Sequence, residues 1–253
     1  MANFAKLFTL RESRRAPEPV PPSAGSRARG VHHSFTLSVL ALKPANFWNV
    51  GVLMKPIKTK RNRWDDHYTE RARKEKYPAR SVFKLQEIQR KFHVIKKGHH
   101  VLDCGCAPGS WLLYSSQLTG PGGKVVGVDV QPVSIHVPKN TVVHTGDVLS
   151  LDEALLTAIG NGYHVVLSDM APSTSGQKGT DAARSYALCS AALNLAVRVL
   201  VPDGGFVSKI FQGEDFQSYR DEVRANFDKV KIFKPMSSRK ASKEIFVIAT
   251  GKL

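Results

Sequence analysis

Cysteine is scarce in this sequence. Only Cys104, Cys106 and Cys189 occur among 253 residues, too few and too irregularly placed for the disulfide framework of a small secreted protein. We therefore expect a reducing compartment. No further pair of Cys or His stands at zinc-ligand spacing, so we interpret Cys104 and Cys106 as small buried residues and expect no metal site.

Long hydrophobic runs are also missing. The longest apolar stretch, residues 35–42, falls far short of the roughly 20 residues that cross a bilayer. The pattern excludes an ordinary transmembrane helix, and we expect no membrane partner.

Acidic residues are the third shortage. The chain has 21 Asp and Glu against 37 Lys and Arg, a formal net charge of +16. This balance indicates a polyanionic partner, most simply nucleic acid, or an acidic membrane surface. Residues 55–80 are strongly basic and interleave cations with Trp64 and Tyr68, a pattern that holds phosphates and stacks on bases. A solvated surface helix explains the same pattern equally well.

The composition changes near residue 53. Residues 1–53 combine a Pro-rich stretch with Ser, Gly and Arg and show no sustained period, so we expect a disordered basic extension. It is either an organellar transit peptide or a segment upstream of a true start at Met54, and we prefer the second. Residues 54–253 then form one folded domain in the cytoplasm, with a mitochondrion or another organelle as the alternative location.

Strand and helix patterns alternate through this domain. The apolar runs predict seven strands, starting at Val101 and continuing at residues 125–130, 141–145, 164–167, 205–211, 229–233 and 243–250. Alternation of this kind predicts an α/β fold of the Rossmann-like type, with a mostly parallel sheet covered by helices on both faces. The last two strands have no helix between them, so we expect an antiparallel hairpin at one edge.

Several residues are suited to begin the helices. We expect Ser81, Ser150 with Glu153, and Asp181 to act as N-terminal caps. In the first of these helices Lys84 lies at the edge of the apolar stripe, from which a long side chain can reach into a cleft.

The stretch from Asp103 to Trp111 carries the strongest local signal. A buried strand leads into a small turn with Gly105 and Gly109, where backbone can approach a ligand closely. The dinucleotide fingerprint has three glycines and no acid, whereas a carboxylate at Asp103 repels a pyrophosphate and suits a cationic or amine-bearing ligand. An ordinary strand-to-helix turn is the alternative for this stretch taken alone.

Acidic residues follow four of the predicted strands. Asp103, Asp129, Asp147 and Asp169 all lie at or just past a strand's carboxyl end. Ligands of such sheets bind beyond these ends, so we expect the four acids to line one crevice. Asp129, about 20 residues past the glycines, stands where an acid takes ribose hydroxyls.

From about Asp66 to Leu253 the chain resembles the FtsJ-type ribose 2'-O-methyltransferases of large-subunit ribosomal RNA. The turn itself resembles motif I of S-adenosylmethionine-dependent methyltransferases. The matching segments are Ala79 to Leu85, Asp103 to Trp111, Ser168 to Pro172 with Ser175-Gly176, Lys209 to Gly213, Lys234-Pro235 with Ser237 to Arg239, and Ser242 to Val247. Cys106 and Ser110 are small departures, because family members often have alanine and glycine there.

The resemblance implies specific site residues. The family's catalytic Lys-Asp-Lys-Glu tetrad maps onto Lys84, Asp169, Lys209 and Glu244. The cofactor is S-adenosyl-L-methionine, and its expected contacts are Asp103, Gly105, Gly109, Trp111, Asp129, Asp147 and Asp169. The implied partner is large-subunit ribosomal RNA or the large ribosomal subunit, and the implied oligomeric state is a monomer.

The chemistry accounts for these residue types. Transfer to a ribose hydroxyl is an in-line displacement, and the hydroxyl is a poor nucleophile until its proton leaves. Our hypothesis is that Lys209 accepts this proton or polarises the oxygen, while Asp169 orients Lys209 and Lys84 holds the hydroxyl or a phosphate. A lysine base must be neutral, which a second cation and desolvation favour and the two carboxylates oppose.

Alternative functions use the same residues. A related enzyme acting on transfer RNA or a messenger-RNA cap has the same tetrad, although the compact loop 173–181 favours ribosomal RNA. A non-enzymatic ribosome-assembly factor is a further alternative, and an NAD-dependent dehydrogenase is disfavoured by the missing third glycine. We expect phosphate contacts from Arg71, Arg73, Lys74, Arg80, Lys234, Arg239, Lys240 and Lys243.

Overall fold

The computed structural model describes residues 63–253, with side chains from His67 onward. The expected extension at residues 1–53 lies outside these described residues. The elements are α1 (Arg63–Lys74), α2 (Val82–Phe92), β1 (His100–Cys104), α3 (Ser110–Thr119), β2 (Lys124–Asp129), β3 (Thr141–Thr145), a 3-10 turn η1 (Val148–Ser150), α4 (Glu153–Ile159), β4 (Tyr163–Ser168), α5 (Lys178–Val199), β5 (Leu200–Phe211), α6 (Phe216–Arg224), β6 (Phe227–Phe233) and β7 (Glu244–Lys252).

The strands form one sheet in the order β3-β2-β1-β4-β5-β7-β6. Strands β1 to β5 pair in parallel, and β7 pairs antiparallel with both of its neighbours, which confirms the predicted mixed sheet. The expected antiparallel hairpin of β6 and β7 is present at one edge of the sheet, with β6 as the outer strand. The reason is burial, because residues 245–249 of β7 are inaccessible whereas Lys229 and Lys231 of β6 face solvent.

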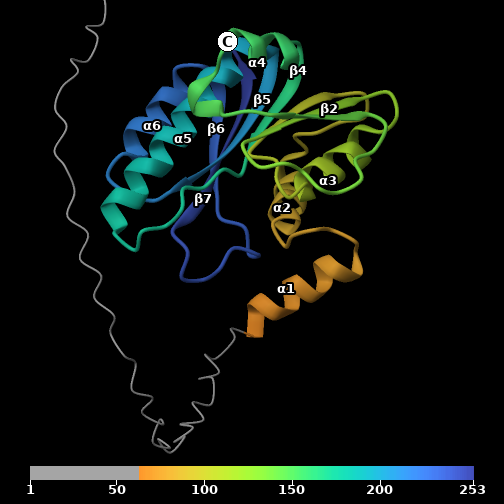
Figure 1. Ribbon diagram of the computed structural model, residues 1–253. Coiled ribbons are helices and arrows are strands. Elements are labelled where there is room, and N and C mark those ends of the chain that lie inside the picture. The colour runs from red at the N-terminus through yellow and green to blue at the C-terminus, as the bar shows by residue number, and fades with distance from the viewer. Residues whose placement is uncertain (1–62) are drawn as a thin grey trace, which may run out of the picture. The chain divides into compact units, whose positions relative to one another are not determined.

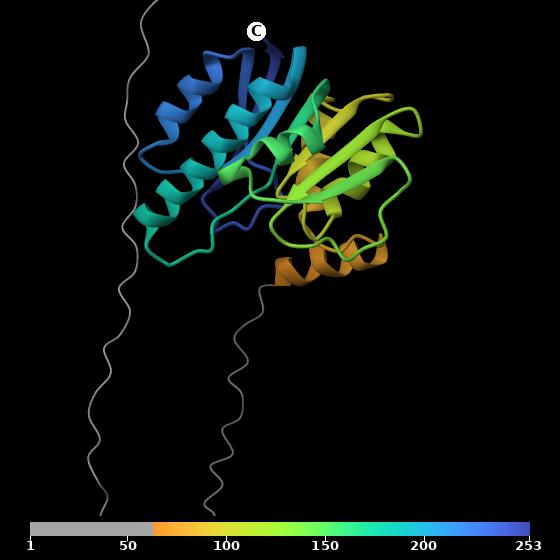
Figure 2. The same cartoon turned by 45° about the horizontal axis from the view of Figure 1, so that its top comes forward.

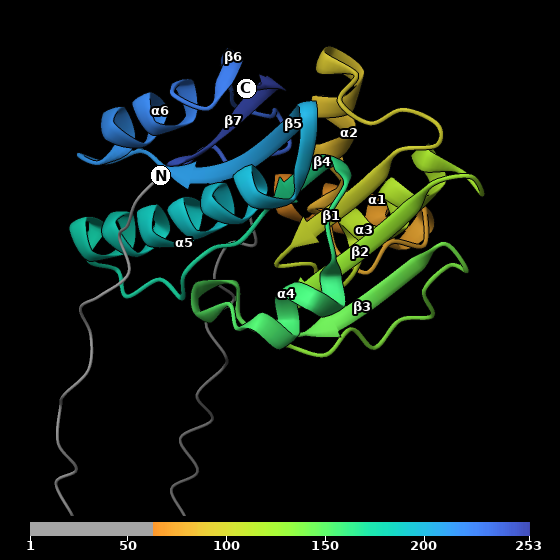
Figure 3. The same cartoon turned by 90° about the horizontal axis from the view of Figure 1, so that it is seen from above.

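Helices cover both faces of the sheet (Figures 1 and 3). Along β1 and β4, Leu102 and Val166 point to a core shared with α5 and α6, while Val101 and Val165 point to a core shared with α2 and α3. This alternation is the period-2 pattern of strands buried on both faces. Helices α5 and α6 lie side by side on their face, as Figure 2 also shows.

A third, smaller apolar cluster joins α1 to α2. Tyr68 packs on Phe83, and the Arg71 guanidinium lies 4.5 Å from the centre of the same ring. The basic segment before residue 80 therefore includes a packed helix. Among residues 63–253, no helix has the length and apolarity needed to cross a membrane.

The predicted caps are wrong in detail. Ser81 precedes α2, but its side chain makes no capping hydrogen bond because its backbone is already helical. Helix α4 is capped by Asp152, whose carboxylate accepts a hydrogen bond from the Leu155 amide, and Ser150 belongs to the preceding turn. Asp181 lies within the first turn of α5, where it accepts hydrogen bonds from the amide and hydroxyl of Ser175.

The cap of α4 can be tested directly. Because Asp152 satisfies one of the free amides at the start of the helix, we expect Asp152→Ala to lower the free energy of unfolding by about 1 kcal/mol. Ser150→Ala is the matched control and should change the free energy of unfolding by only a few tenths of a kcal/mol. Urea unfolding of both variants measures the difference, and an equal loss in the two would contradict the assignment.

Candidate active site

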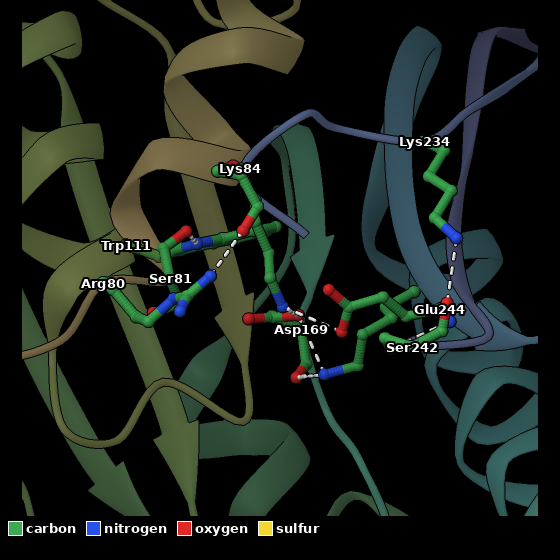
Figure 4. A network of polar contacts seen from close by, with 10 residues as sticks. Arg80, Ser81, Lys84, Trp111, Asp169, Lys234, Ser242 and Glu244 are labelled. Atoms are coloured by element: carbon green, nitrogen blue, oxygen red, sulfur yellow. Dashed lines mark hydrogen bonds and ion pairs between the residues drawn. The ribbon is translucent and has the colours of Figure 1, made fainter. Parts of the chain in front are cut away.

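Four charged side chains meet at the carboxyl ends of the parallel strands. Lys84 comes from the first turn of α2, Asp169 directly follows β4, and Lys209 lies inside β5. Glu244 begins β7, and because β7 is antiparallel its first residue pairs with Phe211 at the end of β5. In Figure 4, Lys84, Asp169 and Glu244 point toward one another from these separate elements.

The four residues form one ion-pair network. The ammonium of Lys84 lies 3.0 Å from Oε2 of Glu244 and 3.5 Å from Oδ1 of Asp169. The ammonium of Lys209 lies 2.8 Å from the same Oδ1 and also donates a hydrogen bond to the backbone carbonyl of Asp169. The predicted Lys-Asp-Lys-Glu tetrad is therefore brought together in space.

The network is largely shielded from water. Its side chains are between 5% and 15% exposed, and Lys209 is the most buried of them. Burial acts to raise the pKa of Asp169, but the two neighbouring ammonium groups outweigh it and hold that pKa below its ordinary value. Asp169 is thus an ionised carboxylate that fixes the two lysines relative to each other.

A cavity of about 560 Å³ opens on one side of Asp169. Four of the residues predicted for the cofactor line it, namely Gly105, Asp129, Asp147 and Asp169. Its apolar lining comes from several elements and includes Val128, Val148, Leu149, Met170, Pro172 and Leu188. We call this space the acidic pocket.

Backbone hydrogen bonds fix the acids of this pocket. The Asp129 carboxylate accepts hydrogen bonds from the amides of Ala107 and Gln131, each at 2.8 Å. The Asp147 carboxylate accepts one from the Leu149 amide at 2.9 Å. Gly105 has a φ of +76°, and a Cβ there would lie 2.3 Å from the side chain of Met170, so the turn needs glycine.

Three other residues predicted for the cofactor have different positions. Asp103 is buried in β1 and its Oδ2 has no hydrogen-bond partner. Gly109 precedes α3 with a φ of +111°, against the side chain of Ile135. Trp111 is buried beneath α2, where its indole N–H donates to the carbonyl of Ser81. None of the three is among the residues that line the acidic pocket, because each is used within the turn or the core.

A second cavity, of about 510 Å³, lies on the other side of the network. Arg80, Lys84, Arg239 and Glu244 line it together with Ser81, Thr174, Phe211, Ser237 and Ser242. Its arginines contrast with the carboxylates of the acidic pocket, and we call it the basic pocket. Ala171 lines both cavities, so the tetrad stands where the two meet.

The residues predicted to bind RNA fall into two groups. Arg80 and Arg239 line the basic pocket, and Lys234, which donates to the carbonyl of Ser242, braces the loop 234–243 beside it. Lys240 and Lys243 are exposed on the same loop. The other three, Arg71, Arg73 and Lys74, are exposed at the end of α1.

Comparison with known proteins identifies the family. Residues 77–252 match the model of the FtsJ-like methyltransferases. The chain belongs to this family. It is 55% identical over 195 residues to the "Ribosomal RNA large subunit methyltransferase E" of Desulforapulum autotrophicum, an alignment covering 77% of this chain and 96% of that relative. A protein of the same name from Desulfatibacillum aliphaticivorans is 50% identical over 199 residues, covering 79% and 96%.

The fold agrees with membership in the FtsJ-like family. A crystal structure from Plasmodium falciparum, designated a ribosomal RNA methyltransferase, superimposes with a TM-score of 0.62 at 24% identity. The superposition covers 70% of this chain and 99% of that one. The predicted methyltransferase fold and enzyme class are confirmed.

Sequence reasoning missed part of the site. Val148 and Leu149 in η1, and Arg184 and Leu188 in α5, line the acidic pocket without belonging to any motif. The amphipathic spacing of α5 signals its buried face, but no local pattern marks which residues border a cavity. Among the described residues, no group of three or more His, Cys, Asp or Glu is arranged to hold a metal ion.

Asp103, whose buried Oδ2 has no hydrogen-bond partner, gives a prediction about stability. Burial, together with the charges of Asp169 and Asp129, raises the pKa of Asp103 well above its ordinary value. The folded protein then keeps a proton that the unfolded chain releases, so Asp103 costs stability as pH rises above the ordinary Asp pKa. We expect the unfolding free energy of Asp103→Asn, relative to wild type, to rise by about 1–3 kcal/mol between pH 4 and pH 7.

Urea unfolding at several pH values measures this change. Asp129→Asn is the control, because its carboxylate already accepts two backbone hydrogen bonds and its replacement should destabilise the protein. Parallel pH profiles for wild type and Asp103→Asn would show that Asp103 is ionised in the folded state.

Proposed function

We propose that this protein transfers a methyl group from S-adenosyl-L-methionine to the 2'-hydroxyl of a uridine ribose in large-subunit ribosomal RNA. The observation that carries the proposal is the position of the tetrad between an acidic and a basic pocket. The family and the printed name of the relatives, which are ribosomal RNA large subunit methyltransferases, supply the substrate class.

The acidic pocket suits S-adenosyl-L-methionine. When bound, this cofactor supplies an electrophilic methyl group on a sulfonium centre. The pocket is lined by three carboxylates, Asp129, Asp147 and Asp169, against one cation, Arg184. This balance favours a ligand that carries a sulfonium and an amine, and it disfavours a pyrophosphate. Asp129 would take the ribose hydroxyls, and the apolar side chains of Val148 and Leu149 would pack on the base.

The basic pocket suits RNA. Arg80 and Arg239 offer guanidinium groups that bind phosphate oxygens and orient the strand. Lys84 faces this pocket from the network and would hold the hydroxyl or an adjacent phosphate. The target ribose would then reach Asp169 and Lys209 from the side opposite the cofactor, as in-line transfer requires.

Lys209 is the group that we assign to the 2'-oxygen. Lys209 forms an ion pair with the Asp169 carboxylate at 2.8 Å and donates a hydrogen bond to the Asp169 backbone carbonyl. An ammonium has three N–H groups, so one donor is left for the 2'-oxygen. As an ammonium, Lys209 would use that donor to polarise the 2'-oxygen while the hydroxyl proton passes to water; as the neutral amine, it would take the hydroxyl proton itself. In either form Asp169 aims the nitrogen, and Glu244 does the same for Lys84.

Both pockets and the whole tetrad come from a single chain. No second copy is needed to complete the site, so we propose that a monomer acts on the large ribosomal subunit.

Transfer of labelled methyl groups tests the proposal. Large subunits from a strain lacking the modification are incubated with the protein, with transfer RNA and capped messenger RNA in parallel. We expect label at a uridine 2'-oxygen of the subunit. Lys209→Ala should lower the rate at least about 100-fold while S-adenosyl-L-methionine binding, measured by calorimetry, stays within about twofold.

The control is Lys124→Ala, which should keep wild-type activity. Lys124 is the exposed first residue of β2, at the end of the parallel strands remote from the tetrad. Label in transfer RNA or in the cap alone would move the protein to another RNA substrate. Cofactor binding without transfer to any RNA would favour the assembly-factor alternative, and full activity of Lys209→Ala would refute the role of that lysine.

A further inference from the structure

Glu87 lies one turn after Lys84 on α2 and has no part in the tetrad. Its two carboxylate oxygens accept hydrogen bonds from consecutive backbone amides, from Met236 at 2.6 Å and from Ser237 at 2.9 Å. Both amides belong to the loop 234–243 that joins β6 to β7. A single side chain of α2 therefore fastens a segment about 150 residues away in the sequence.

Arg80 binds the same residue of the loop, Ser237, through its carbonyl group. Its Nη2 donates a hydrogen bond to the carbonyl of Ser237 at 2.7 Å. The amide of Ser237 is thus bound to Glu87 and its carbonyl to Arg80, and the residue is only 1% exposed. Hydrogen bonds to charged groups are stronger than neutral ones, so the loop has a defined position against α2.

This loop forms one wall of the basic pocket and leads directly into the tetrad. Ser237, Arg239 and Ser242 line the pocket, and Glu244 follows them at the start of β7. Glu244 in turn pairs with Lys84, as Figure 4 shows. With the hydrogen bonds of Glu87, α2 therefore holds the loop at both ends. The distance between α2 and the loop sets the width of the pocket and the approach of Glu244 to Lys84.

The charge of Glu87 is opposite to that of the other charged residues of α2. It is the one acid in α2, which also carries Lys84, Arg90 and Lys91. A carboxylate near the RNA-binding surface repels phosphates unless its oxygens are engaged by hydrogen-bond donors of the protein. Here both oxygens face amides of the loop, so the carboxylate acts on the loop and leaves the basic character of the pocket intact.

We propose that Glu87 is a positioning residue, which holds the loop 234–243 against α2 and so keeps the basic pocket in the shape that admits the RNA. The inference rests on the proposed function for the identity of the substrate. The hydrogen bonds from the Met236 and Ser237 amides to Glu87, which we call the clamp, are a property of the protein alone.

The activity test uses substitutions of Glu87. We expect Glu87→Ala to lower kcat/KM for large subunits about tenfold, mainly through KM, because losing charge-assisted bonds loosens the pocket wall. Glu87→Gln keeps one good acceptor and should lose less. Affinity for S-adenosyl-L-methionine should not change, since the acidic pocket lies on the other side of the tetrad.

Glu222 provides the matched control. Glu222 lies in α6, and its carboxylate likewise joins two elements, because it accepts hydrogen bonds from the hydroxyl groups of Tyr186 and Ser190 in α5. Glu222→Ala should therefore lower thermal stability while leaving KM for the large subunit unchanged. A purely structural role for Glu87 would give the same pattern as Glu222.

Hydrogen exchange gives a readout that needs no RNA. In wild type and Glu222→Ala we expect slow exchange of the Met236 and Ser237 amides, and in Glu87→Ala faster exchange of these amides with the rest of the sheet unaffected. Unchanged exchange, or faster exchange with an unchanged KM, would overturn the proposal. If the wild type methylates no subunit, the proposed function fails, and unchanged exchange in the Glu87 variants would separately overturn the clamp.

Discussion

The carboxylate of Asp169, held between the ammonium groups of Lys84 and Lys209, is the constraint on which the site depends. Taking four charges largely out of water is costly, and each is tolerated here because an opposite charge lies within hydrogen-bond distance or close to it. Removal of one partner leaves another buried charge uncompensated, a change that costs about 3–5 kcal/mol in typical buried pairs. The network therefore fixes the positions of α2, β4, β5 and β7 relative to one another at this edge.

The topology of the sheet explains how distant residues reach this network. Asp169 arrives at the carboxyl end of a parallel strand, as acids of such sheets commonly do. Glu244 arrives there only because β7 runs antiparallel between β5 and β6, which brings its first residue to the same edge. Residues at the carboxyl ends of β1 and β2 help to line the acidic pocket, and residues of α2 and the loop 234–243 help to line the basic pocket.

Much of this arrangement follows from the sequence. Strand-end acids, the glycine turn and the family resemblance together indicate the sheet, the tetrad and four residues of the acidic pocket. The place of β7 and the cap of α4 do not follow, because they depend on which strand is buried and on a one-residue choice between neighbouring polar side chains. The contacts of Glu87 could not be predicted from the sequence either, because its partners are backbone amides about 150 residues away and no pattern of side chains indicates them.

The most direct test of the network is a double-mutant cycle on Lys84 and Glu244, measured as single-turnover methyl transfer to large subunits. If the tetrad acts as one unit, Lys84→Ala and Glu244→Ala should each slow transfer, and the double variant should be no slower than the worse single. Lys84→Ala combined with Glu222→Ala, two residues of separate networks, should show additive effects. Additive losses for Lys84 and Glu244 would contradict the network, because the two side chains would then act independently.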